Sequence, residues 1–204
     1  MFNNLEFDNR MLNSLPVDRM KKVFPRRVAN AIFSQARPEH VTNPKLVAIS
    51  APALQLIGVD CPNDILSSEQ EAEIALYLSG NKLMRQSRPH AHCYCGYQFG
   101  IFAGQLGDGA AVSLGEVVSR IPVPPASSDM TPLSALTRNE LQIKGAGVTP
   151  YSRKYVDFSL HFCSSRAVQS FSLTFHGIRV ASIYSINLCV WLLLVLVALM
   201  VERS

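Results

Sequence analysis

The sequence lacks the features that mark nucleic-acid binders and secreted proteins. Its net charge of +4 is mildly basic, but no dense stripe of Lys and Arg runs along it, so nucleic acid is not an expected partner. The N-terminus has no apolar segment of a secretory signal, and Glu6 and Asp8 argue against a typical transit peptide. One short cluster of cations, interrupted by apolar residues, is interpreted as a solvated surface; it comprises Lys21, Lys22, Arg26 and Arg27.

Cysteine is also scarce, with five residues and no spacing typical of a disulfide scaffold. A reducing compartment is therefore the default expectation. His92, Cys93 and Cys95 lie too close together to supply the ligands of a tetrahedral metal site by themselves, and no second Cys/His pair lies nearby. We expect these cysteines to be structural thiols and assign no metal ligand.

What the sequence does contain is the composition of a globular protein. It has 204 residues, of which 48% are hydrophobic and 17% charged, enough for one domain or slightly more. Ser50 precedes a predicted helix that ends at Gly58. Ser67 and Gln70 have the spacing of a capping box, which predicts a second helix that ends at residues 79–81. The predicted apolar face of this second helix consists of Ile74, Leu76 and Tyr77.

Glycine recurs after residue 96, and residues 104–109 have the pattern G-x-x-G-x-G before an apolar run at 110–118. We predict a loop followed by a strand. Glycine lets the backbone approach phosphate oxygens, and successive amides can bind an anion. The pattern matches neither the dinucleotide-binding fingerprint nor the P-loop, and many such loops are merely tight turns. Residues 121–137 are rich in Pro and Ser and are predicted to be an irregular linker.

Lys144 ends a second predicted strand, residues 140–144. A strand lysine that follows a glycine-rich hairpin is the arrangement with which protein kinases hold ATP phosphates. The alternative is an ordinary lysine on an edge strand. The residues alone leave both interpretations open.

The C-terminal part of the sequence differs in composition from the rest. Residues 183–201 carry no charge, and about 19 helical residues span roughly 28 Å, close to the thickness of a bilayer core. We predict a hydrophobic helix there, which is either a membrane-spanning tail anchor, a buried core helix or a tail from alternative splicing. Residues 155–182 are interpreted as a divergent linker.

Several motifs of the chain, in this order, closely resemble the N-terminal part of the selenoprotein O family. The resemblance covers about residues 5–154. The motifs that carry it are FDNR at 7–10, LPVD at 15–18, YLSGN at 77–81, HCYCG at 92–96, FAGQLGDG at 102–109, LGE at 114–116 and KGAGVTPYSR at 144–153.

That resemblance implies a pseudokinase-like fold that binds ATP with Mg²⁺ and transfers AMP to Ser, Thr or Tyr hydroxyls of proteins. Eukaryotic members are mitochondrial. By the same resemblance, nucleotide binding is expected at Gly107, Asp108, Gly109 and Lys144, whereas Ala110 stands where many bacterial members have Arg.

The resemblance ends after Arg153, and the family's catalytic and metal-binding residues have no counterpart in this sequence. We therefore assign no catalytic residue and expect the 204-residue chain to be a truncated form that is inactive alone. The alternatives are a non-enzymatic, membrane-anchored interaction variant, or a tail translated from an intron or a shifted frame.

The predicted fold class is α+β. Residues 1–154 would form part of a kinase-like N-terminal lobe with a small antiparallel sheet, followed by the 155–182 linker and the 183–201 helix. A half-domain exposes the apolar face that its partner lobe would cover, so marginal stability is expected.

Overall fold

The computed structural model describes residues 2–60, 66–98, 100–107, 110–123, 133–152, 178–185 and 194–200. Its class is α+β, as predicted. The helical elements of these ranges are the 3-10 helix η1 (Phe2–Asn4) and the α-helices α1 (Arg10–Ser14), α2 (Ala51–Leu56) and α3 (Ser68–Leu78). The strands are β1 (Glu6–Phe7), β2 (Phe33–Gln35), β3 (Lys45–Leu46), β4 (His90–Gln98), β5 (Ile101–Gly107), β6 (Val112–Val123), β7 (Leu133–Lys144), β8 (Ile178–Ser185) and β9 (Leu194–Met200).

The named strands pair in antiparallel fashion around the β6–β7 hairpin. The order along the sheet is β2-β4-β6-β7-β8-β9-β3, while β1 pairs with β6 and β5 pairs with β4. The strands predicted at 110–118 and 140–144 are both confirmed, and both are longer than predicted.

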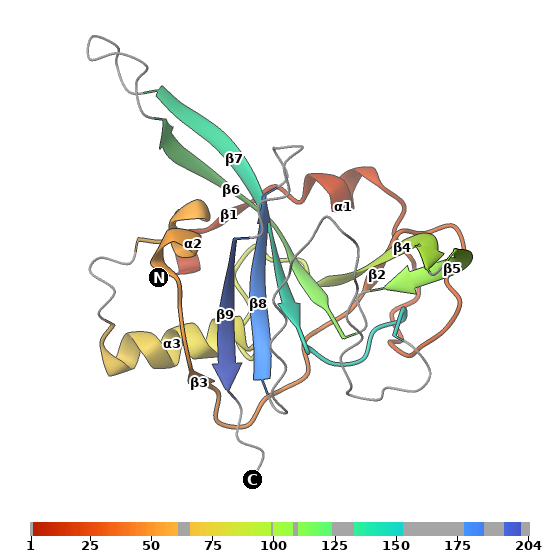
Figure 1. Cartoon of the computed structure of the whole chain (residues 1–204), viewed down its shortest axis with the longest axis horizontal. Helices are drawn as coiled ribbons and strands as arrows, with labels where there is room; N and C mark the ends of the chain where they lie inside the picture. The colour runs from red at the N-terminus through yellow and green to blue at the C-terminus, as the bar shows by residue number, and fades with distance from the viewer. Residues whose placement is uncertain are drawn as a thin grey trace.

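The outer half of the β6–β7 hairpin projects from the body of the molecule as an arm (Figure 1). The predicted irregular linker is therefore wrong for residues 121–123 and 133–137, which are paired strands; residues 124–132 lie outside the described part. Among the described residues each strand of the arm is paired on one side only, so proline does not prevent this pairing. Pro122 therefore occupies the kind of edge position that tolerates a missing N–H.

Helix α3 begins with the predicted capping box. The Ser67 hydroxyl accepts a hydrogen bond from the Gln70 amide at 3.2 Å, and the Gln70 side chain accepts one from the Ser67 amide at 2.9 Å. The buried face includes Ile74 and Tyr77 as predicted, but Leu76 is 39% exposed. Two residues beyond Ile74 correspond to about 200° of rotation, which points Leu76 away from the core.

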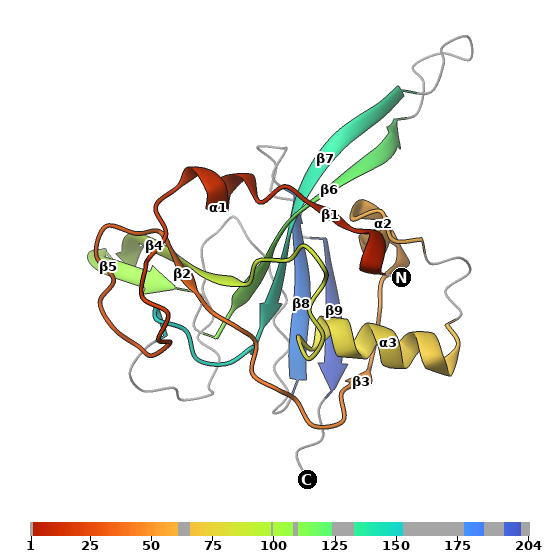
Figure 2. The ribbon, with the colours of Figure 1, turned by 180° about the vertical axis from the view of Figure 1, so that it is seen from behind.

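Helix α2 also forms where predicted, after Ser50, and Gly58 ends it with φ +78°. The Ser50 hydroxyl makes no capping hydrogen bond. Helix α3 lies against one face of the sheet near β3 and β9 (Figure 2). The core that results combines side chains of both helices with those of β6 and β7; its largest members include Leu54, Ile57, Ile74, Tyr77, Leu114, Leu141 and Ile143.

The predicted hydrophobic helix at 183–201 is wrong for the residues that the structure describes. Residues 183–185 end β8, and residues 194–200 form β9. Strand β8 pairs with β7, and β9 pairs with both β8 and β3. Sequence alone could not separate these outcomes, because an apolar run without turn signals fits a buried strand as well as a helix. No helix within the described ranges is long and apolar enough to cross a bilayer.

Candidate nucleotide site

Lys144 is the last residue of β7, as the sequence predicts, and its side chain is half-buried. It pairs with Val180 of β8, and the preceding Ile143 pairs with Val112 of β6. Strand β7 is therefore flanked on both sides at this point. The interpretation of Lys144 as an ordinary edge lysine does not hold.

The glycine-rich segment differs from its prediction. Residues 104–107 belong to β5 rather than to a loop, and Gly107 pairs with Cys93 of β4. The chain has already reversed near Gly100, whose φ is +81°, so the following residues run back along β4. Asp108 and Gly109 lie outside the described residues.

The loop at residues 145–152, which follows Lys144, contacts the glycine segment at Gly107 and the residue after it, Ala110. The Ala146 amide donates a hydrogen bond to the Ala110 carbonyl at 2.7 Å. On the other side, Tyr151 packs so closely on Gly107 that an added Cβ would lie 2.5 Å from the Tyr151 Cβ. The described neighbours of residues 108 and 109 therefore meet the turn that follows Lys144.

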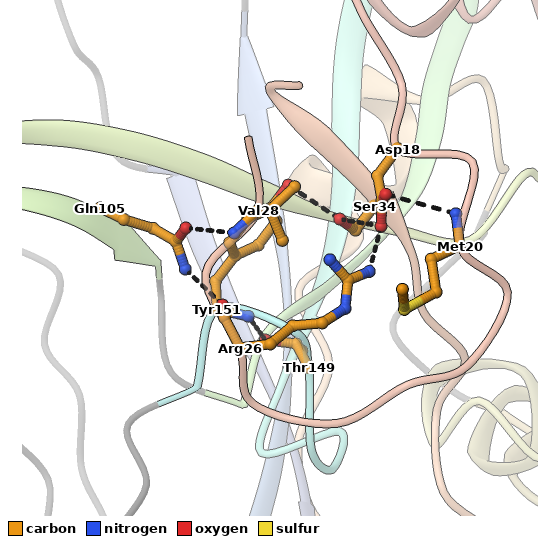
Figure 3. A network of polar contacts seen from close by, with 8 residues as sticks. All are labelled: Asp18, Met20, Arg26, Val28, Ser34, Gln105, Thr149 and Tyr151. Carbon is orange, nitrogen blue, oxygen red and sulfur yellow. Dashed lines mark hydrogen bonds and ion pairs between the residues drawn. The ribbon is translucent and has the colours of Figure 1, made fainter. Parts of the chain in front are cut away.

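A polar network joins this loop to the segment of residues 18–34 (Figure 3). The Ser34 hydroxyl donates a hydrogen bond to an Asp18 carboxylate oxygen at 3.2 Å and is also hydrogen-bonded to the Tyr151 hydroxyl at 2.9 Å. Asp18 forms an ion pair with Arg26. The Arg26 amide donates to the Pro150 carbonyl at 3.0 Å. Segment 18–34 and loop 145–152 are thus joined through both backbone and side-chain contacts.

Gln105 joins segment 18–34 to β5. Its amide nitrogen donates to the Arg26 carbonyl and its amide oxygen accepts from the Val28 amide, each at 2.8 Å. Burial raises the pKa of the Tyr151 phenol, so the phenol stays protonated at neutral pH. Burial opposes ionisation of Asp18, but hydrogen bonds and the Arg26 charge outweigh it and hold the pKa of Asp18 below its usual value.

A second cluster of side chains lies between α1 and the strands, and no motif of the sequence indicates it. Its residues line a small pocket: Asn9, Met11, Leu12, Phe33, His90, His92, Glu116 and Glu140. Burial lowers the pKa of His90 to about 4, so this imidazole is neutral at pH 7. Glu116 accepts a hydrogen bond from the Met11 amide at 2.6 Å, in the first turn of α1. That bond gives Glu116 the role of attaching α1 to the sheet.

The described residues bring together no group of three or more His, Cys, Asp or Glu side chains that could hold a metal ion. The Cys93 side chain is half-buried and packs against the core.

Comparison with known proteins agrees with the motif resemblance. Residues 27–157 match the family model described as protein adenylyltransferase SelO. The match spans most of the chain, which belongs to this family.

The chain is 48% identical to the mouse protein adenylyltransferase SelO, mitochondrial, and 49% identical to its zebrafish relative SelO-1. Each match covers 74% of this chain and 21% of the relative. A bacterial relative from Tolumonas auensis, named protein nucleotidyltransferase YdiU, is 43% identical over 74% of this chain and 25% of its own length. The chain therefore spans about a fifth to a quarter of the length of these relatives.

Proposed function

We propose that the chain contributes the ATP-binding side of a protein adenylyltransferase site. In that reaction a Ser, Thr or Tyr hydroxyl of a protein substrate attacks the α-phosphorus of ATP. The new oxygen–phosphorus bond carries AMP onto the substrate, pyrophosphate leaves and the hydroxyl loses its proton. Family membership supports this class of chemistry, because the relatives are named adenylyltransferases and nucleotidyltransferases.

The observation that carries the proposal is the position of Lys144. It ends an interior strand, and the turn that follows it is hydrogen-bonded to Ala110, directly after the glycine segment. A half-buried cation in this place can pair with phosphate oxygens. The amides of Gly107, Asp108 and Gly109 are proposed to complete the phosphate contacts.

Four further features of the proposal rest on family membership alone: Mg²⁺, a kinase-like lobe, protein substrates and a mitochondrial location. The expectation that these 204 residues do not transfer AMP by themselves is separate from ATP binding and stays a prediction.

Replacing Lys144 tests the proposal directly. Lys144→Met removes the cation while keeping a long apolar stem, and we expect it to weaken ATP binding about tenfold or more, because a charge-assisted hydrogen bond is lost. Titration calorimetry with ATP measures the change, and thermal unfolding verifies that the variant is folded.

Lys82→Met is the matched control. Lys82 is exposed after α3, with its ammonium 4.5 Å from the Tyr77 ring, so the same substitution there should leave ATP affinity unchanged. Equal affinity of wild type and Lys144→Met would refute the proposed role of Lys144.

A further inference from the structure

Residues 19–27 form a loop that exposes cations and apolar side chains together; we call it the basic loop. Its exposed cations are Arg19, Lys21, Lys22 and Arg27. Its exposed apolar side chains are Met20 at 47%, Val23 at 40% and Phe24 at 41%. The loop contains no Asp or Glu. Apolar side chains at this density on a charged surface suit contact with a partner better than contact with water.

The backbone of the basic loop is fixed at its base (Figure 3). Asp18 accepts a hydrogen bond from the Met20 amide at 3.3 Å and pairs with Arg26, so the acidic group next to the loop is already engaged. Gln105 of β5 holds the far end through Arg26 and Val28. A fixed backbone lowers the entropy that docking would cost.

The basic loop also borders the candidate nucleotide site. The Arg26 amide is hydrogen-bonded to the Pro150 carbonyl, and the next residue, Tyr151, packs on Gly107. The basic loop is therefore joined directly to loop 145–152 of the candidate site.

We propose that the basic loop docks acidic, partly apolar segments of the protein substrate. The inference rests on the proposed function, because it takes the substrate to be a protein and the site to hold ATP. Four exposed cations attract carboxylates and repel lysine-rich segments, which gives selectivity more than affinity. Met20, Val23 and Phe24 supply the apolar and aromatic contacts that are typical of protein interfaces. The position beside the nucleotide site favours a protein segment over an anionic lipid surface.

Peptide binding by the 204-residue chain tests the idea without requiring catalysis. The probe is a fluorescein-labelled peptide in which a serine is flanked by glutamate, leucine and phenylalanine, and the comparison peptide has lysine for each glutamate. Fluorescence anisotropy should show clear preference for the acidic peptide. The double variant Lys21→Glu/Lys22→Glu should lower its affinity about tenfold or more, and Phe24→Ser should lower it severalfold.

The matched control is Arg37→Glu/Arg85→Glu, which makes the same charge change at two exposed positions outside the loop. This variant should bind the acidic peptide as wild type does. If the loop and control variants lost the same affinity for the acidic peptide, the effect would be due to net charge alone and the proposal would be overturned. Absence of a preference for the acidic peptide would do the same.

Vesicles of phosphatidylserine and phosphatidylcholine provide the competing outcome. If the loop variants abolish sedimentation with these vesicles but leave peptide binding intact, the loop is a lipid-binding surface and the proposal is wrong. Lys144→Met separates the two proposals, since it should keep peptide binding while losing ATP affinity. Unchanged ATP affinity in that variant would count against the nucleotide site without altering the peptide result.

Discussion

At the scale of single residues, Gly107 has a structural requirement that the sequence pattern did not indicate. The pattern suggests that glycine stands there so that the backbone can approach phosphate oxygens. The structure places Tyr151 where a side chain at 107 would begin, so packing alone already demands glycine. A residue 44 positions away in the chain decides this, and no local pattern could have predicted it.

Gly107→Ala should therefore destabilise the protein by about 2 kcal/mol, because the added methyl overlaps Tyr151 in a packed region. Chemical denaturation measures the loss. Gly104→Ala in the same strand is the control: its Cβ would meet nothing within 4 Å, and only the left-handed backbone at φ +66° adds a cost, about 1 kcal/mol.

A double-mutant cycle with Tyr151→Gly identifies the cause. The cost of Gly107→Ala should shrink in the Tyr151→Gly background, because the Tyr151 Cβ that the added methyl would overlap is gone. An equal cost in both backgrounds would show that Tyr151 is not the reason for the glycine.

At the scale of elements, helices and strands could be predicted best from the sequence where the contacts that determine them join residues close together in the chain. Helix α3 was predictable because its capping box joins Ser67 and Gln70, three residues apart. Residues 104–107 of β5 are predicted to be a loop and the β6–β7 arm a linker, because both strands depend on pairing with partners outside the local sequence. The apolar run at 194–200 is a strand for the same reason: it pairs with β3, about 150 residues earlier in the chain.

Ser67→Ala should lower the free energy of unfolding by about 1 kcal/mol, because the Gln70 amide loses its capping acceptor at the start of α3. Denaturant titration measures the change. Ser68→Ala, one residue on and also exposed, should change stability by much less. Equal effects of the two substitutions would mean that the capping box contributes nothing.

At the scale of the whole molecule, the candidate site is assembled from three separate parts of the chain. Segment 18–34, the β4–β5 hairpin and loop 145–152 meet through Ser34, Gln105 and Tyr151. The sequence could predict Lys144 at a strand end and, through the family resemblance, a nucleotide role for it. It could not predict the network that positions the loop, because its members are up to 117 positions apart.

Amide hydrogen exchange with and without ATP locates the nucleotide site on the chain. ATP is expected to slow exchange at residues 104–113 and 142–152, the segments that flank the candidate site, and to leave α3 unchanged. Lys144→Met should abolish this protection. Unaltered exchange in both segments at saturating ATP, or protection confined to other parts of the chain, would contradict the assignment of the nucleotide site.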